Sequence, residues 1–443
     1  MATESKDDTS RPVDLSSAAR PNRIEQVPIL LKDITESVNS LTKGTDEDRK
    51  DVLVKCRALV QAVQTPRETM VDHCWGQMGA IAAVGFGVDS GLWVLMAQNG
   101  DKTQKVVDLA MSLGVDARLL SRLMRHLGAM GLLVEVGEDE YRPTNYTRCL
   151  SLPQIGHGYL GLTACTGAGT LKFHEFSRKR GWVNPLDPKD TSLMYAYGTN
   201  KHIFNWVQDS GYGTHLNDYL GGYGVGRPLW MDPAVYPVKE RLINDANPSP
   251  DAPFLVDIGG NVGHDLARFH SRYPDAPGKL ILQDLPMMIR QIKDLDPAIV
   301  RMEYDFHNEQ PIKGRVVPLS SFSLPQFHFN PILLIISIGA RAYYIHSTLH
   351  NWSDDVCETI LTRVKEAMKP GYSRLLINEF VVPQIGAHWE TTGLDMLMLT
   401  LFSSEQRTNK AWYDLVERRV GLKIVKIWSS GKGVESVIEC ELA

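Results

Sequence analysis

The sequence has few cysteines and no excess of positive charge, and each absence excludes a class of function. Only 6 of its 443 residues are cysteine, and none of them forms a CxxC or other close pair. A zinc site and a disulfide framework are therefore not expected, and the thiols are expected to stay reduced in the cytoplasm. The formal net charge of -5 predicts neither nucleic acid nor an anionic membrane as a partner.

Long apolar runs are also missing. The polar and acidic N-terminus has no apolar segment of the kind found in signal peptides. The most apolar window, Phe329–Ala340, is far shorter than the roughly 20 residues that a membrane span needs. The composition, 43% apolar and 22% charged, is typical of a soluble globular protein. We therefore expect a soluble, intracellular protein of two or three domains with a small-molecule or protein partner.

The first 150 residues predict a helical region. Residues 1–22 are rich in Ser, Asp, Thr and Pro and are predicted to be disordered. Apolar residues recur at helical spacing over 24–63, which fits two amphipathic helices, and residues 78–96 resemble a buried helix pair. In 106–150 the pattern is a helix, a turn at Gly114, a second helix capped by Asp116, and two short strands. This order is typical of a winged helix.

Two interpretations of the winged helix remain. It would bind DNA if Arg118, Arg122 and Arg125 faced phosphates. Alternatively it is a packing and dimerisation element that carries solvated arginines. The acidic flanks and the negative net charge favour the second interpretation. We therefore predict a helical dimerisation domain over residues 23–150 and a homodimer, because the apolar helices have too little neighbouring chain to bury them.

The texture of the sequence changes twice after residue 150. Residues 151–250 are rich in aromatic side chains, and we expect a helical connecting region whose rings fill a core or line an apolar pocket. The proline-rich segment 247–253 is the predicted domain boundary. Over 251–443 strands and helices alternate, which is typical of a mainly parallel sheet. Strands are expected at 254–258, 279–283, 300–304, 341–345, 373–380 and 422–428, the last pairing with 434–441.

A glycine-rich turn follows the first of these strands. Gly259, Gly260 and Gly263 allow a tight turn and close approach of the backbone to a ligand. The next apolar strand ends in Asp284, whose carboxylate can accept hydrogen bonds from both hydroxyls of a ribose. Taken alone, this strand–turn–helix pattern fits NAD, FAD or S-adenosylmethionine.

Asp257 decides between these cofactors. A carboxylate ahead of the turn would repel the pyrophosphate of a dinucleotide, whereas the sulfonium and amino-acid tail of S-adenosylmethionine tolerate an acidic neighbour. The simpler alternative is a strand-end cap. Asp305 and Phe306 after the third strand, and His346 after the fourth, suggest an adenine site, since an acid and an aromatic ring suit its amine and its face. We therefore predict S-adenosylmethionine as the cofactor.

The most specific stretch in the chain is residues 342–355, AYYIHSTLHNWSDD. It resembles the motif around the catalytic base of plant-type and fungal O-methyltransferases that act on phenols, the caffeate O-methyltransferase class. The resemblance extends from about residue 75 to 443, and several of its motifs resemble the fungal secondary-metabolism branch. These further motifs are GRPLWMDP at 226–233, VDIGG at 256–260, HDL at 264–266, LQDLP at 282–286 and INE at 377–379.

The resemblance implies a fold and a mechanism. The expected fold is α/β, a Rossmann-like class I methyltransferase domain preceded by an α-helical winged-helix dimerisation domain. His350 is implied as the general base, with Glu379 and Glu405 as the carboxylates that hold it. The chemistry agrees, because a phenol has a pKa near 10 and needs a base, and an ordinary histidine has a pKa near 6.5. No metal is needed, and the acceptor is expected to be a small aromatic or polyketide-derived molecule.

The sequence departs from the family pattern in three places. Asn261 replaces a third glycine, and Asn tolerates positive φ better than other residues. The family's Glu-Arg-Thr falls on 406–408, so either Glu405 reaches the base by a small shift or the amide of Gln406 replaces the acid. Residues 315–339 are inserted relative to the family, and 316–340 contain no charged residue. Our hypothesis is a translated intron or gene-model error, and the alternative is an extra strand.

Two other functions compete with methylation. Some fungal relatives of this fold keep S-adenosylmethionine and catalyse dehydration or pericyclic reactions, and retention of His350 and Glu379 favours methylation over them. A winged-helix regulator would need a basic recognition face, which the sequence does not show.

Overall fold

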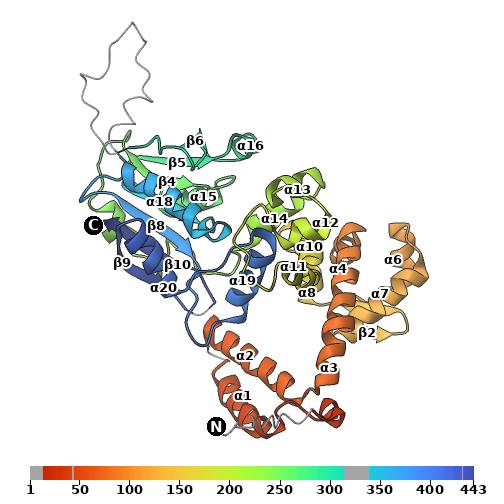
Figure 1. Cartoon of the computed structure of the whole chain (residues 1–443). Coiled ribbons are helices and arrows are strands. Elements are labelled where there is room, and N and C mark those ends of the chain that lie inside the picture. The colour runs from red at the N-terminus through yellow and green to blue at the C-terminus, as the bar shows by residue number, and fades with distance from the viewer. Residues whose placement is uncertain (1–12, 42–43, 314–338, 432) are drawn as a thin grey trace, which may run out of the picture. The chain divides into compact units, whose positions relative to one another are not determined.

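The computed structural model describes residues 13–41, 44–313, 339–431 and 433–443. The chain divides into two compact units, residues 1–152 and 153–443 (Figure 1). The predicted insertion at 315–339 lies outside the described residues, apart from Gly339.

The first unit begins with the two predicted amphipathic helices, α1 (Val27–Leu41) and α2 (Asp46–Val63), which pack against each other. A capping box starts α2: the Thr45 hydroxyl accepts from the Asp48 N–H, and the Asp48 carboxylate accepts from the Thr45 N–H. These bonds satisfy backbone donors that the helix itself leaves unpaired. The chain continues through α3 (Pro66–Val71), the π-helical η3 (Asp72–Gln77), α4 (Met78–Asp89) and α5 (Leu92–Asn99).

The structure differs from the predicted disorder of residues 1–22 over the part that it describes. Residues 13–26 contain two 3-10 helices, η1 (Leu15–Ala19) and η2 (Ile24–Gln26). The Asp14 carboxylate accepts from the Ser16 N–H, and the backbone N–H of Asn22 donates to the Gln64 carbonyl at 2.9 Å. A local side-chain bond and a backbone bond to the end of α2 thus hold a polar segment that composition alone assigns to a disordered tail.

The predicted buried helix pair is α4 and α5. Ala83, Val84 and Trp93 are buried, and the Trp93 indole donates to the Val84 carbonyl at 3.0 Å. Gly87 allows this packing, because a Cβ there would lie 2.4 Å from the Trp93 ring. Within the described ranges no single helix is long and apolar enough to cross a membrane; one pair, 66–89 with 92–99, passes that test by length and composition only and is bent by 73°.

The rest of the first unit contains the predicted helix–turn–helix and hairpin. These elements are α6 (Val106–Leu113), α7 (Ala117–Ala129), β2 (Leu133–Gly137) and β3 (Glu140–Pro143), with the short β1 (Gln104–Lys105) completing a sheet of order β1-β3-β2. Gly114 ends α6 in the left-handed conformation at φ 68°, and the Asp116 carboxylate caps α7 through the Leu119 N–H. A short helix, α8 (Asn145–Cys149), follows.

The second unit opens with short helices. They are α9 (Pro153–Gly156), α10 (Gly158–Leu171), α11 (Phe173–Lys179), α12 (Ser192–Tyr197), α13 (Ile203–Asp209) and α14 (Gly213–Gly222). Cys165 of α10 and Leu193 of α12 share a buried core with Met398 and Leu401 of α19 (Trp389–Phe402). Because α19 comes from the far side of the predicted boundary at 250, this region and the sheet form one compact unit.

A seven-stranded sheet forms the rest of the second unit. Its strands are β4 (Pro253–Ile258), β5 (Lys279–Asp284), β6 (Ile299–Glu303), β7 (Ala342–His346), β8 (Arg374–Glu379), β9 (Leu422–Ser429) and β10 (Ser436–Leu442). Their order is β6-β5-β4-β7-β8-β10-β9; β4 to β8 pair in parallel, and β10 is antiparallel to both neighbours. Each predicted strand is present, with bounds that differ by at most about two residues.

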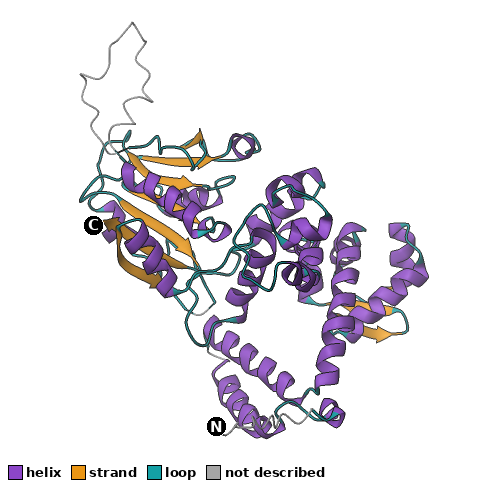
Figure 2. Cartoon of the chain, viewed as in Figure 1, coloured by secondary structure: helices purple, strands orange, loops and turns teal. Residues whose placement is uncertain are grey.

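Helices cover both faces of this sheet (Figure 2). On one face lie α18 (Asp354–Ala367), α20 (Asn409–Tyr413) and η7 (Asp414–Arg419); on the other lie α15 (His264–Arg272) and η4 (Lys239–Ile243). Such burial explains the nearly continuous apolar sequence of β4 and β7. The strand order reverses between β4 and β7, and ligands of open α/β sheets bind at the carboxyl ends of such strands.

Candidate active site

The glycine turn after β4 forms a close-packed cradle. Gly259 and Gly263 have φ of 75° and 88°, which favour glycine. A Cβ on Gly260 would lie 2.4 Å from Asp257 Oδ2, so a side chain there is excluded. Asn261 adopts a φ of 55°, as the sequence analysis expected of an asparagine in this turn.

Asp284 stands at the end of β5, as predicted, and is tied to this turn. Its Oδ2 accepts from the Asn261 N–H at 2.8 Å, and its Oδ1 accepts from the Leu285 N–H at 2.7 Å. Burial raises the pKa of the Asp284 carboxyl, although the two backbone donors oppose that rise. Asp284 therefore holds the turn in place.

Asp257 is 1% exposed, and neither of its oxygens has a hydrogen-bond partner among the described residues. Burial, reinforced by the negative charge of Asp265, raises the pKa of Asp257 well above its usual value. A buried carboxylate without a partner is costly unless a ligand completes the site. Beside a glycine cradle, it fits a cofactor that carries positive charge.

Phe306 lies against the same turn. Its ring comes within 3.9 Å of a Cβ position on Gly259, and it meets the Trp352 ring edge-to-face at 6.1 Å. Asp305 accepts from the His307 N–H at 3.0 Å. Of the two residues predicted for the adenine, Phe306 lies at the glycine turn, whereas Oδ1 of Asp305 accepts a hydrogen bond within its own loop.

His350 lies in η6 (Leu349–Asn351), just after β7, and is buried beside Glu379 at the end of β8. His350 Nδ1 is 3.0 Å from Glu379 Oε2. The other oxygen, Oε1, accepts the backbone N–H groups of Thr348 and Leu349 at 2.9 Å each and that of His350 at 3.3 Å. Burial alone would raise the pKa of Glu379, but the charge and hydrogen bonding of His350 hold it below its usual value. The structure thus brings these two predicted residues together.

The second predicted carboxylate is corrected by the structure. Gln406 is buried, and its side-chain amide nitrogen Nε2 lies 2.8 Å from His350 Nδ1, whereas Glu405 is exposed and makes no hydrogen bond or ion pair with the ring among the described residues. The Gln406 N–H is held by Asp395 at 2.7 Å, which fixes the register of this segment. A shift of one residue would remove that bond, so the amide occupies the position that Glu405 was expected to take.

The segment that carries Gln406 also clamps the loop of the base. The Ser404 hydroxyl donates to the His350 carbonyl. The buried Arg407 donates to the carbonyls of Leu349 at 3.0 Å and Trp352 at 2.8 Å. The family resemblance had drawn attention to this stretch, but only the structure shows that three of its side chains hold one short loop.

His346 makes contacts that the sequence analysis did not predict. Its Nδ1 is 2.6 Å from Asp265 Oδ2, and its Nε2 is 3.2 Å from Glu435 Oε1. Burial would lower the pKa of His346, but Glu435 and Asp265 together raise it well above its usual value. Asp265 belongs to the HDL motif and was visible there, whereas Glu435 comes from the β9–β10 hairpin and carries no sequence signal.

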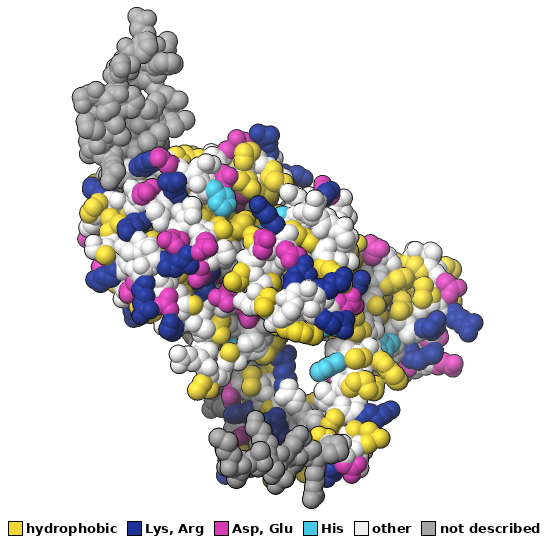
Figure 3. All heavy atoms as spheres, viewed as in Figure 1, with side chains coloured by type: hydrophobic (Ala, Val, Ile, Leu, Met, Phe, Trp, Pro, Cys, Tyr) yellow, Lys and Arg dark blue, Asp and Glu magenta, His cyan; other side chains and the backbone are white. Residues whose placement is uncertain are grey.

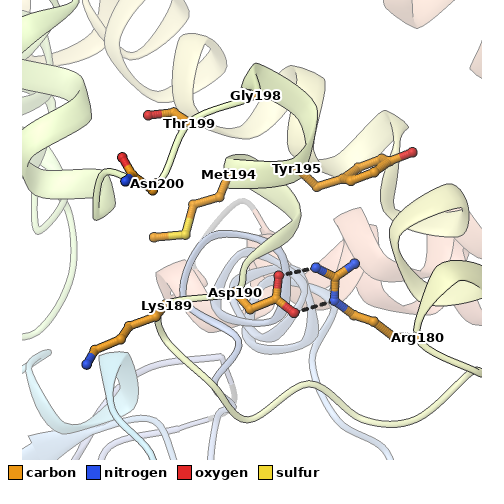
Figure 4. Close-up of a pocket in the computed structure, with 8 residues that line it drawn as sticks. All are labelled: Arg180, Lys189, Asp190, Met194, Tyr195, Gly198, Thr199 and Asn200. Atoms are coloured by element: carbon orange, nitrogen blue, oxygen red, sulfur yellow. Dashed lines mark hydrogen bonds and ion pairs between the residues drawn. The ribbon is translucent and has the colours of Figure 1, made fainter.

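A separate hollow of about 660 Å³ lies between α11 and α12. In Figure 4, the Arg180 and Asp190 side chains point toward each other and form a bidentate ion pair. Met194 and Thr199 also line the hollow. None of the predicted site residues lines it. It adjoins the site through Ser403, whose hydroxyl donates to the Asp190 carbonyl at 2.8 Å.

Known proteins are similar to this chain in sequence. An O-methyltransferase domain model matches residues 336–421, which include His350, Glu379 and Gln406. O-methyltransferase mfmE of Annulohypoxylon moriforme is 31% identical over 400 residues, or 90% of this chain and 92% of that protein. The chain belongs to the O-methyltransferase family. Membership confirms the predicted family, the enzyme class and S-adenosylmethionine as the cofactor.

Solved structures share the fold. A pericyclic reaction enzyme superposes with a TM-score of 0.78 at 23% identity, covering 95% of this chain and 100% of that one. OxaC in complex with SAH and oxaline gives a TM-score of 0.77 at 22% identity, covering 95% and 99%. The predicted methyltransferase fold, a helical N-terminal region followed by a mostly parallel sheet, is therefore confirmed.

Proposed function

We propose that this O-methyltransferase methylates a hydroxyl of a small aromatic or polyketide-derived molecule, with His350 as the general base. One observation carries the proposal. Glu379 and Gln406 both face Nδ1 of His350, and among the described residues nothing bonds its Nε2. An imidazole held at one nitrogen presents the other to a substrate proton, which is the arrangement that general-base catalysis requires.

The residues of the glycine turn are those that would hold the cofactor. Asp284 would accept hydrogen bonds from the ribose hydroxyls, Phe306 would lie against a face of the adenine, and the unpartnered Asp257 would face the positive end of the cofactor. When bound, S-adenosylmethionine supplies an electrophilic methyl group on a sulfonium. Thr348, two residues before the base, lies 3.2 Å from the Cβ position of Gly259, so the turn and the catalytic loop are neighbours.

The proton balance follows from this placement. With S-adenosylmethionine bound, His350 Nε2 would accept the proton that the acceptor hydroxyl gives up when its oxygen is methylated. The buried Glu379 stabilises the imidazolium that results, because an opposite charge within about 4 Å favours the protonated ring. Arg407 and Ser404 hold the loop, so the ring does not have to be ordered at each turnover.

An aromatic surface beside the base supports a flat acceptor. The Trp352 ring, two residues beyond His350, stacks on His202 with a centroid distance of 5.8 Å and an interplanar angle of 8°. Phe402 meets His202 at 5.9 Å. Flat apolar molecules are recognised by rings placed in this way.

Transfer of the labelled methyl group from S-adenosylmethionine to a panel of phenols and phenolic polyketides tests the proposal. Appearance of label in an acceptor ether supports it. Conversion of an acceptor without transfer of label would favour the rival class, a cofactor-binding enzyme that dehydrates or rearranges its substrate.

For the first unit, we propose a winged-helix dimerisation domain. Its exposed apolar side chains include Ile29, Val60, Trp75 and Met111, the last two 68% and 78% exposed. Figure 3 shows hydrophobic side chains on the visible surface of this unit. A second copy would bury such a surface, as obligate homodimers do. Arg125 pairs with Asp139 of the hairpin turn at 3.7 Å, which further weakens the DNA-binding interpretation. Light scattering at micromolar concentration is expected to give a dimer, and a monomeric mass would contradict the assignment.

A further inference from the structure

The base of this enzyme has one carboxylate partner. Oε1 of Glu379 accepts hydrogen bonds from three backbone N–H groups, and only Oε2 contacts the ring of His350. The group on the other side of Nδ1 is the amide of Gln406, which is buried and adds no charge.

An amide holds an imidazole differently from a carboxylate. A carboxylate accepts hydrogen bonds only, so it favours the protonated Nδ1 and the imidazolium. The Gln406 amide can accept a hydrogen bond from a protonated Nδ1 through its carbonyl, or donate one to an unprotonated Nδ1 through its N–H group. A rotation of the amide by about 180° exchanges the two groups. Gln406 therefore keeps the ring of His350 in place in either state without strengthening it as a base.

The other charged groups near His350 do not take the place of a second carboxylate at Nδ1. Arg407 places a guanidinium against the loop, bonded to the Leu349 carbonyl, and so adds a positive charge near the ring and not a negative one. Asp354 offsets that charge by pairing with Arg407 at 2.8 Å. The ionisable groups on the elements packed around the ring are Glu379 of β8, His346 of β7, Asp354 and Cys357 of α18, Asp395 of α19, and Glu405 and Arg407 of the clamp segment.

We propose that Gln406 is a positioning residue that limits the strength of the base, and that the acceptor is a hydroxyl made acidic by a conjugated carbonyl or a similar electron-withdrawing group. The inference rests on the proposed role of His350. General-base catalysis is most efficient when base and acid are matched in strength. A base supported by one carboxylate suits a hydroxyl more acidic than an ordinary phenol, whose pKa is near 10.

Titration of the His350 ring by NMR tests the role of Gln406 without any acceptor. The protein is labelled with ¹³C-histidine, and the His350 signal among the 13 histidines is identified by its loss in His350→Gln. Gln406→Glu is expected to move the titration midpoint upward by about one to two pH units, and Glu379→Gln to move it downward by about one. Gln384→Glu, which adds the same charge at an exposed position, is the matched control and is expected to leave the midpoint in place.

An unchanged midpoint in folded Gln406→Glu overturns the proposal. If circular dichroism shows that this variant does not fold, Glu379→Gln decides, and an unchanged midpoint there also overturns it. Because no methyl transfer is measured, the titration result stands even if the proposed function fails.

The acceptor class is tested with the wild-type enzyme and two phenols of similar size. At pH 7, 4-hydroxyacetophenone is expected to be methylated at least about tenfold faster than 4-ethylphenol, because its hydroxyl is the more acidic. Equal rates, or faster methylation of 4-ethylphenol, would overturn the assignment of an acidic acceptor. In Gln406→Glu the ratio is expected to narrow, which a purely structural role of Gln406 would not produce.

Discussion

Replacement of His350 by alanine separates a catalytic role from a structural one. If Nε2 is the base, turnover should fall by about 10²–10⁴, which raises the barrier by roughly 3–5 kcal/mol. The structural cost should be smaller, because Glu379 keeps the backbone N–H bonds to Oε1 and loses only the contact at Oε2. A loss of about 1–3 kcal/mol in the free energy of unfolding is expected. Among the described residues, no hydrogen bond or ion pair joins the ring to Asp284 or the glycine turn, so cofactor affinity should be unchanged.

Three measurements make the comparison: single-turnover transfer of labelled methyl, calorimetry with S-adenosylmethionine, and thermal unfolding. The base must be deprotonated to accept a proton, so the wild-type rate should fall toward acid pH, and that limb should vanish in the alanine variant. A His350→Ala protein that folds, binds the cofactor and methylates its acceptor at the wild-type rate would refute the mechanism. Joint loss of folding and cofactor binding would instead identify a structural histidine.

Other residues of the site carry further predictions. Asp284→Ala should weaken binding of S-adenosylmethionine by roughly 2–4 kcal/mol in calorimetry, and unchanged affinity would remove its assignment to the ribose. Burial raises the pKa of Asp257, so its favourable effect on stability is present below about pH 4 and is lost as the pH rises through the raised value. Asp257→Asn should therefore unfold at a higher temperature than the cofactor-free wild type at pH 7 and bind the cofactor more weakly; equal unfolding temperatures would contradict the lack of a partner for this carboxylate. Arg407→Met should cost about 2–4 kcal/mol in urea unfolding, chiefly because it leaves the buried carbonyl of Leu349 and that of Trp352 without their donor, and a loss under about 1 kcal/mol would show that the clamp is not needed.

Local patterns accounted for most of the architecture. The strands were predicted within about two residues because each is an apolar run bounded by turn residues, and Asp116 and Gly114 marked helix ends by well-understood chemistry. The insertion at 315–339 stays outside what the structure describes, and the hypothesis of a translated intron stays a prediction that sequencing of the transcript would settle.

The catalytic clamp could be predicted only in part. The resemblance pointed to His350 and Glu379, and the structure places their side chains in contact. The resemblance left Glu405 and Gln406 as alternatives, because the sequence alone does not show which of two adjacent residues points toward His350. The bond from Asp395 to the Gln406 N–H decides that register, and Asp395 stands on a helix that the sequence does not link to this position.

The elements and the glycine turn could be read from the sequence, because they depend on residues that are near one another along the chain, and the family resemblance added His350 as the candidate base. Tertiary structure alone decided which groups surround the base and His346. Glu435 reaches His346 from a hairpin 89 residues away, and Gln406 reaches His350 from 56 residues away. Because β7, β8 and β10 are neighbours in the sheet, the hairpin that carries Glu435 lies beside His346. A bridge between Val382 and Thr408 holds the segment of Gln406 near the end of β8. Burial turns these distant side chains into partners that set charge and orientation at the site.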